Sequence, residues 1–153
     1  MCPPLLAAVS SDAAEPARED AGWAVVVVGP GDVWAEGDVD ITRDGLFGNP
    51  FRMLVEGDRE GVVAAYGELL SCRSGVREIA GRRHVSFSKG AERVRVHKRM
   101  EGLSRLAERA RGIVAGGGSP LRLRCVCAPR KCHGDVIREW VLARTVARSR
   151  WAV

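Results

Sequence analysis

Residues 121–135 constrain the fold of this chain more than any other segment, because their hydrophobic period changes partway along. As far as Cys127, apolar residues alternate with arginine or valine, which is the period of a β-strand. From Val136 onward, the apolar residues recur at helical spacing. The segment therefore predicts a strand, a short loop and a helix in succession. α/β proteins bind ligands at such junctions, where a strand's carboxyl end meets a helix's amino end.

The rest of the chain also alternates between predicted strands and helices. The pattern predicts strands at 23–28 and 38–43, and helices over 59–71, 98–115 and 132–148. Because strands separated by helices build parallel sheets, we expect an α/β fold with a small, mostly parallel sheet flanked by helices, in a Rossmann-like layout.

The length and composition fit one globular domain, which we expect over residues 22–148. Residues 1–21 lack any period and are predicted to form a disordered tail, and residues 149–153 a short second tail. No apolar run reaches the length of about 20 residues that a membrane-spanning helix needs. The N-terminus lacks the basic start of a secretory signal, so we expect a cytoplasmic protein whose cysteines are thiols or metal ligands.

Residues 72–98 allow two interpretations. Alternation at 84–88 and 93–97 predicts a β-hairpin, whereas the basic composition fits a disordered insertion equally well. The arginine-rich run 82–105 also supports a nucleic-acid-binding domain as an alternative function. This run lacks the interleaved aromatic residues that stack on bases, so nucleic acid is not the favoured partner.

The junction holds three of the five cysteines and one of the three histidines, and its first interpretation is a metal site. Thiolates and imidazole are the usual ligands of Zn²⁺. The candidate ligands are Cys125, Cys127, Cys132 and His133. On a strand, Cys125 and Cys127 would point to the same face. Under this alternative, zinc would stabilise a non-catalytic interaction module.

The second and favoured interpretation is a reactive site that needs no cofactor. Cys132 begins the predicted helix, where the amide dipoles lower a thiol's pKa and favour a nucleophile. His133 would exchange protons, Asp135 would orient it or bind a substrate hydroxyl, and Arg130 would counter negative charge. In the third interpretation these residues are structural: Cys125 is core, and Asp135 only complements the helix dipole.

A second candidate loop has the sequence Gly48-Asn49-Pro50-Phe51, or GNPF. Gly48 permits a tight turn, Pro50 keeps Asn49 extended, and the Asn49 amide can donate and accept hydrogen bonds. If this loop and the cysteine loop follow neighbouring parallel strands, they meet in one crevice. The expected ligand-binding residues there are Arg43, Gly48, Asn49, Cys127, Arg130 and Gly134. A packing turn, with Asn49 bonded only to backbone, is the alternative.

Two separated motifs resemble the family of domain of unknown function 4326. They are the GNPF loop and the run Cys127-Ala128-Pro129 followed by Cys132-His133-Gly134-Asp135-Val136. Ile41 and Arg43 fall at the spacing that this family shows. The chain departs from the family pattern at Val126, where an aromatic residue is common, and in a longer segment over 72–118. The resemblance implies a short α/β domain and assigns no activity.

Together these features predict a polar crevice that binds or processes a nucleotide-like or phosphorylated small molecule. Cys132, His133 and Asp135 are the expected catalytic residues if the protein is an enzyme.

Overall fold

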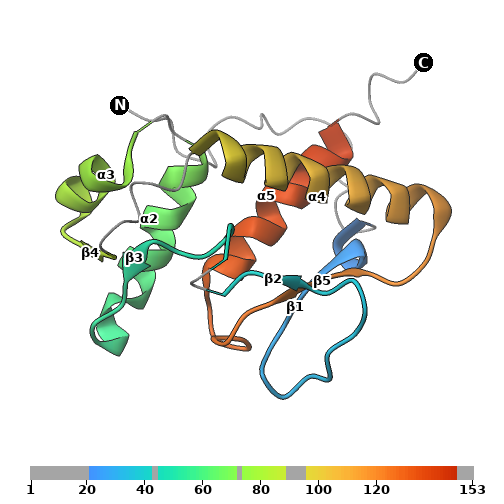
Figure 1. Ribbon diagram of the computed structural model, residues 1–153, viewed down its shortest axis with the longest axis horizontal. Coiled ribbons are helices and arrows are strands. Elements are labelled where there is room, and N and C mark those ends of the chain that lie inside the picture. The colour runs from blue at the N-terminus through green and yellow to red at the C-terminus, as the bar shows by residue number, and fades with distance from the viewer. Residues whose placement is uncertain (1–20, 43–44, 72–73, 89–95, 148–153) are drawn as a thin grey trace, which may run out of the picture.

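The computed structural model describes residues 21–42, 45–71, 74–88 and 96–147 (Figure 1). Five strands and four α-helices follow one another in these residues, with two 3-10 turns, η1 (Gly22–Ala24) and η2 (Glu56–Asp58). The elements in chain order are β1 (Val25–Val28), β2 (Val39–Asp40), β3 (Phe51–Arg52), α2 (Arg59–Ser71), α3 (Val76–Arg83), β4 (Ser86–Phe87), α4 (Val96–Gly116), β5 (Leu121–Arg124) and α5 (His133–Ala147). The two predicted tails lie outside the described residues, apart from Ala21.

The main sheet has three parallel strands in the order β1-β5-β2, which confirms an α/β fold with a small parallel sheet. β5 is central and pairs with β1 from Val25↔Leu121 to Val28↔Arg124. Because all three strands run the same way, the segments after β2 and β5 emerge at one edge of the sheet. Ile41 and Cys125 lie at this edge, and both are buried.

The loop between β1 and β2 is fastened to β5 by charged groups. The Asp38 carboxylate, only 2% exposed, pairs with Arg122 Nε at 3.0 Å and Arg124 Nη1 at 3.2 Å. The Arg124 guanidinium also stacks on the ring of Trp34, 3.8 Å from its centroid. The two arginines of the predicted strand therefore stabilise the sheet by binding the loop between β1 and β2.

The predicted hairpin within 72–98 is wrong. β4 pairs antiparallel with β3, which lies far upstream, with Phe51 opposite Phe87. Val96 and His97 belong to the first turn of α4, and residues 89–95 lie outside the described part of the chain. The segment instead contains α3, whose buried residues Val76, Ile79 and Ala80 have the helical spacing that the sequence analysis missed.

The helices close the core over the sheet and beside it. α2 has the predicted bounds and buries most of one face, including Tyr66 and Leu69. α4 and α5 pack against each other and both contact the main sheet, while α2, α3, β3 and β4 form the other side of the molecule (Figure 1). None of the described helices is both long and apolar enough to span a membrane.

Candidate functional site

The two predicted loops meet at one cavity of about 90 Å³. It lies beside the sheet edge where β2 and β5 end, and α2 closes it on one side. The lining residues are Thr42, Asn49, Met53, Arg59, Val62, Val63, Cys125, Val126, Cys127, Cys132 and His133. Residues from both sequence motifs therefore share this cavity.

Cys132 immediately precedes α5, and the helix start is bonded around it. Its backbone N–H donates to Asp135 Oδ2 at 2.9 Å, and its sulfur accepts from the Gly134 N–H at 3.3 Å. The Asp135 N–H donates to the Cys132 carbonyl at 3.1 Å. The Asp135 carboxylate and the Cys132 sulfur thus cap the start of α5 much as a capping box does, but the sulfur accepts from the second amide of the helix and not from the third. The amide groups of Cys132 and Gly134 at the helix start are thus bonded to side chains of the chain itself.

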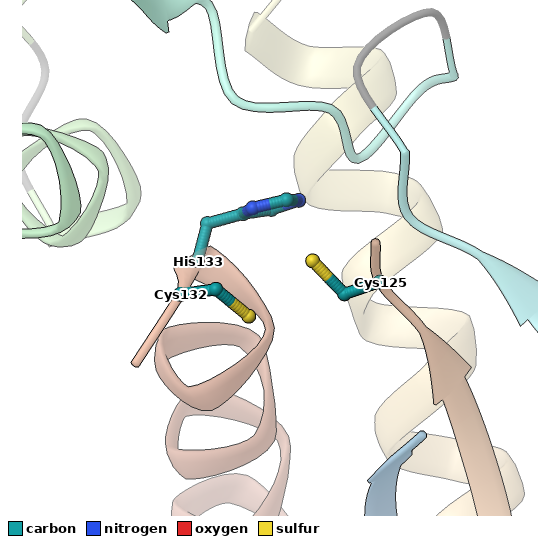
Figure 2. A group of neighbouring side chains, drawn as sticks. All are labelled: Cys125, Cys132 and His133. Atoms are coloured by element: carbon teal, nitrogen blue, oxygen red, sulfur yellow. The ribbon is translucent and has the colours of Figure 1, made fainter. Parts of the chain in front are cut away.

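Three potential metal ligands are gathered at the same point. The sulfurs of Cys125 and Cys132 and a ring nitrogen of His133 lie within 4.8 Å of one another, and all three residues are buried. In Figure 2, the sulfurs face each other from the end of β5 and the start of α5, below the edge of the imidazole. Among the described residues, Cys127 is not part of this group.

The imidazole of His133 is held by backbone and by an aromatic ring. Its Nε2 lies 2.5 Å from the Ile41 carbonyl oxygen. A carbonyl only accepts hydrogen bonds, so Nε2 carries a hydrogen. The Tyr66 ring meets the imidazole edge-on, with centroids 5.2 Å apart and planes at 71°. These contacts fix the ring beside the two sulfurs.

The two buried thiols have opposite acidities. A hydrogen bond from the Cys125 thiol lowers the pKa of Cys132 to about 7, against the effect of burial, and the Gly134 amide adds to the lowering. The same bond, followed by burial, raises the pKa of Cys125 far above its usual value. Cys132 is thus the sulfur that carries negative charge, as the sequence predicts for a thiol at a helix start.

Asn49 holds the GNPF loop against α2. Its Oδ1 accepts from the Phe51 N–H at 2.9 Å, and its Nδ2 donates to the Val62 carbonyl at 3.4 Å. The Gly48 carbonyl accepts from the buried Arg99 of α4 at 3.4 Å. Asn49 therefore lines the cavity with a side chain whose donor and acceptor already bind backbone, as in the packing-turn interpretation.

Arg59, the first residue of α2, is a cavity residue that the sequence analysis missed. Its side chain is 11% exposed and makes a two-pronged pair with Glu56, with Nε–Oε1 at 2.5 Å and Nη2–Oε2 at 2.8 Å. Its Nη1 donates to the Lys131 carbonyl at 3.0 Å, which ties α2 to the cysteine loop. A cation in the first turn of a helix is unfavourable because it opposes the helix dipole. This unfavourable position of Arg59 is the one feature of the sequence that could have marked it as a candidate site residue.

The predicted basic residues are placed differently. Arg130 lies outside the cavity lining; its side chain is 64% exposed and pairs with Glu56 at 3.4 Å. Arg43 lies outside the described residues. The cavity's described cationic side chain is thus Arg59.

Cys125 and Cys127 do not share a strand face, because β5 ends at Arg124. The Cys125 N–H still donates to the Val28 carbonyl at 3.0 Å, but the next residues turn away. Cys127 starts a turn closed by the Arg130 N–H, in which the Ala128–Pro129 peptide is cis. Half-buried Cys127 contacts the Arg59 guanidinium instead.

No curated protein and no solved structure was found to match the chain. A family model does match residues 29–143, which contain both motif loops, strands β2 and β5 of the main sheet, and most of α5. The chain therefore belongs to the family of domain of unknown function 4326 (DUF4326).

Proposed function

We propose that the cavity binds a small anionic molecule, such as a nucleotide or sugar phosphate, and that Cys132 and His133 are the reactive groups at its floor. The observation that carries the proposal is the convergence of both motif loops on one cavity that is also lined by Arg59, whose side chain is largely enclosed. Mostly apolar cavities with a few convergent polar groups are the usual form of small-molecule sites. A Rossmann-like arrangement would also place the ligand at the carboxyl edge of the sheet.

The size of the cavity limits what enters it. Its volume of about 90 Å³ is well below the roughly 300–1,000 Å³ of typical ligand pockets. A phosphate or another compact polar group would enter, and the rest of the ligand would lie over the rim. Exposed Val126 forms part of that rim. The exposed side chain of Arg130, four residues further along the same loop, would contact the outer part of the ligand.

Arg59 is the group we assign to the anion. Its planar fork donates paired hydrogen bonds of the kind that phosphate and carboxylate accept. Glu56 holds the fork in the ligand-free structure, but the Glu56 side chain is 60% exposed. An incoming anion would displace this mobile surface carboxylate while the Lys131 carbonyl keeps Arg59 in place.

Asp135 acts indirectly in this proposal, because its carboxylate binds the Cys132 backbone N–H. It positions the start of α5, and with it the sulfur of Cys132 and the ring of His133. Gly134 has a similar positioning role through its N–H bond to the sulfur.

The test is ligand binding by calorimetry under reducing conditions, which match the cytoplasm we infer for the protein. The probes are inorganic phosphate, adenosine monophosphate and ribose 5-phosphate. We expect Arg59→Gln to weaken the best of them at least 10-fold, since a charged hydrogen bond contributes about 1.5–3 kcal/mol.

Arg105→Gln is the matched control. Arg105 also pairs with a helical neighbour, Glu101, at 2.6 Å, but its side chain is 74% exposed and lies on α4. The control should leave the affinity unchanged. Binding that survives Arg59→Gln, or no binding by any of the three probes, would contradict the proposal.

The nucleic-acid alternative gains no support from the described residues of its arginine-rich run. Arg82 and Arg83 pair with Glu68, and Arg99 is buried against the GNPF loop. Arginines engaged in this way do not form the exposed basic stripe that binds phosphate backbones.

A further inference from the structure

Three side chains at the cavity floor have the chemistry and spacing of a metal site (Figure 2). Cys125, Cys132 and His133 are 3%, 2% and 8% exposed, and their donor atoms lie within 4.8 Å of one another. Bonds of about 2.3 Å to sulfur and 2.0–2.1 Å to nitrogen put the ligands of tetrahedral zinc about 3.4–3.8 Å apart. The donors therefore need to approach by only about 1 Å.

The histidine is already oriented as a metal ligand. Metal-binding histidines donate their second ring nitrogen to a carbonyl or carboxylate, which fixes the tautomer. His133 has such a contact, with Nε2 at 2.5 Å from the Ile41 carbonyl oxygen. The ring contact with Tyr66 restrains the same orientation.

The sulfur of Cys132 is also positioned to bind a metal ion. The Gly134 N–H points at its sulfur at 3.3 Å, at the positive end of α5. This contact holds the sulfur in place at the start of α5. Two thiolates and one imidazole suit zinc better than magnesium or calcium, which prefer oxygen.

We propose that Cys125, Cys132 and His133 bind one zinc ion and leave its fourth coordination position open toward the cavity. This inference rests on the proposed function in one respect, because it places the metal at the floor of the proposed ligand cavity. All three residues line that cavity, whereas Cys127 lines it without joining the group. Three protein ligands are typical of catalytic zinc, while structural sites have four. Bound there, zinc would polarise a ligand's oxygen or activate water.

This assignment makes Cys132 a zinc ligand and no longer a nucleophile. It also differs from the metal site that the sequence predicts as its first interpretation, in which Cys127 completes a closed set of four zinc ligands. The two alternatives are distinguished by the behaviour of a Cys127 variant.

The experiment is elemental analysis of the untagged full chain, produced with added zinc and purified without chelator. We expect about one zinc per chain in the wild type and in Cys127→Ser, and almost none in Cys132→Ser or Cys125→Ser. Loss of a ligand should lower zinc affinity by more than the roughly 10–100-fold that follows loss of a supporting contact. Cys127→Ser is the matched control, because it removes a neighbouring sulfur of the same cavity.

Two measurements on the wild type keep the test independent of variant folding. Cobalt(II) added to zinc-free protein should give the intense visible bands of tetrahedral coordination together with thiolate charge transfer. Zinc should protect two of the thiols, Cys125 and Cys132, from alkylation, and a chelator should expose them. A chain that takes up neither metal would overturn the proposal, as would zinc retained by Cys132→Ser. Zinc lost from Cys127→Ser would overturn the open fourth position.

Failure of this inference is separable from failure of the proposed function. If the chain takes up no zinc but still binds phosphate through Arg59, the zinc site is wrong and the ligand cavity stands. If zinc binds as expected but no phosphate compound does, the metal site stands and the proposed ligand class is wrong.

Discussion

Gly134, in the first turn of α5, has no room for a side chain. A Cβ at this position would lie 2.9 Å from Ile41 Cδ1, 3.0 Å from Val27 Cγ1 and 3.2 Å from Cys132 Sγ. Comfortable carbon contacts are about 3.5–4.0 Å, so the Ile41 and Val27 side chains would have to move by roughly half an ångström and the Cys132 sulfur by a few tenths. Overpacking of this kind costs about 1–3 kcal/mol. We therefore predict that Gly134→Ala destabilises the protein despite the better helix propensity of alanine.

Gly112→Ala supplies the control that isolates this cost. Gly112 is exposed on α4, and a Cβ there would have no neighbour within 4 Å. Its replacement should raise the free energy of unfolding by about 0.5–1 kcal/mol through helix propensity alone.

Urea unfolding followed by tryptophan fluorescence measures both variants. The free energy of unfolding of Gly134→Ala should fall below that of Gly112→Ala by at least the packing cost, about 1–3 kcal/mol. Equal stability of the two variants would show that the start of α5 does not pack closely on the sheet edge, and would refute the geometry of the site.

Two further changes test a buried hydrogen bond of α2 and the ion pairs of the loop between β1 and β2. Tyr66→Phe should lower the free energy of unfolding by about 1–3 kcal/mol, because the buried hydroxyl donates to the Phe47 carbonyl at 2.7 Å; a urea midpoint equal to wild type would contradict this. For Asp38, burial acts to raise the pKa, but the Ala35 amide and the guanidinium groups of Arg122 and Arg124 outweigh it and hold the pKa below its usual 3.8. Asp38 therefore stabilises the fold above about pH 4 and loses this effect as the pH falls through its folded pKa. Thermal unfolding across an acid pH series should show the wild-type advantage over Asp38→Asn constant near neutrality and shrinking below pH 4; an advantage that persists at the lowest pH would contradict the ion pairs.

Local patterns in the sequence predicted the elements that carry the site, but not how far they extend. The junction from β5 to α5 was found as expected, because both periods are strong over several residues. The alternation continues to Cys127 and predicts a strand that is too long. β5 ends at Arg124 because its partner β1 ends at Val28. Strand length is thus decided by a segment that lies far away in the chain.

Contacts between distant segments explain the other differences. The pairing of β4 with β3 joins residues that are separated by two helices. A short run of alternating residues predicts a strand, but it does not identify the strand with which it pairs. Arg59 lines the cavity because α2 packs beside the cysteine loop. The sequence alone does not reveal this packing of two distant segments. Cys132 and His133 lie together at the cavity, since adjacent residues at a helix start stay together whatever the rest of the fold.

The strand order β1-β5-β2 has a consequence for how the protein is made. Among the described strands the central one is the last to leave the ribosome, so β1 and β2 wait without their shared neighbour until residue 124 has been synthesised. Loop closure over such distances makes folding slower, and it leaves unpaired strand edges exposed in the meantime. A ribosome-bound chain that stops before residue 121 should therefore be more sensitive to protease than one extended past α5.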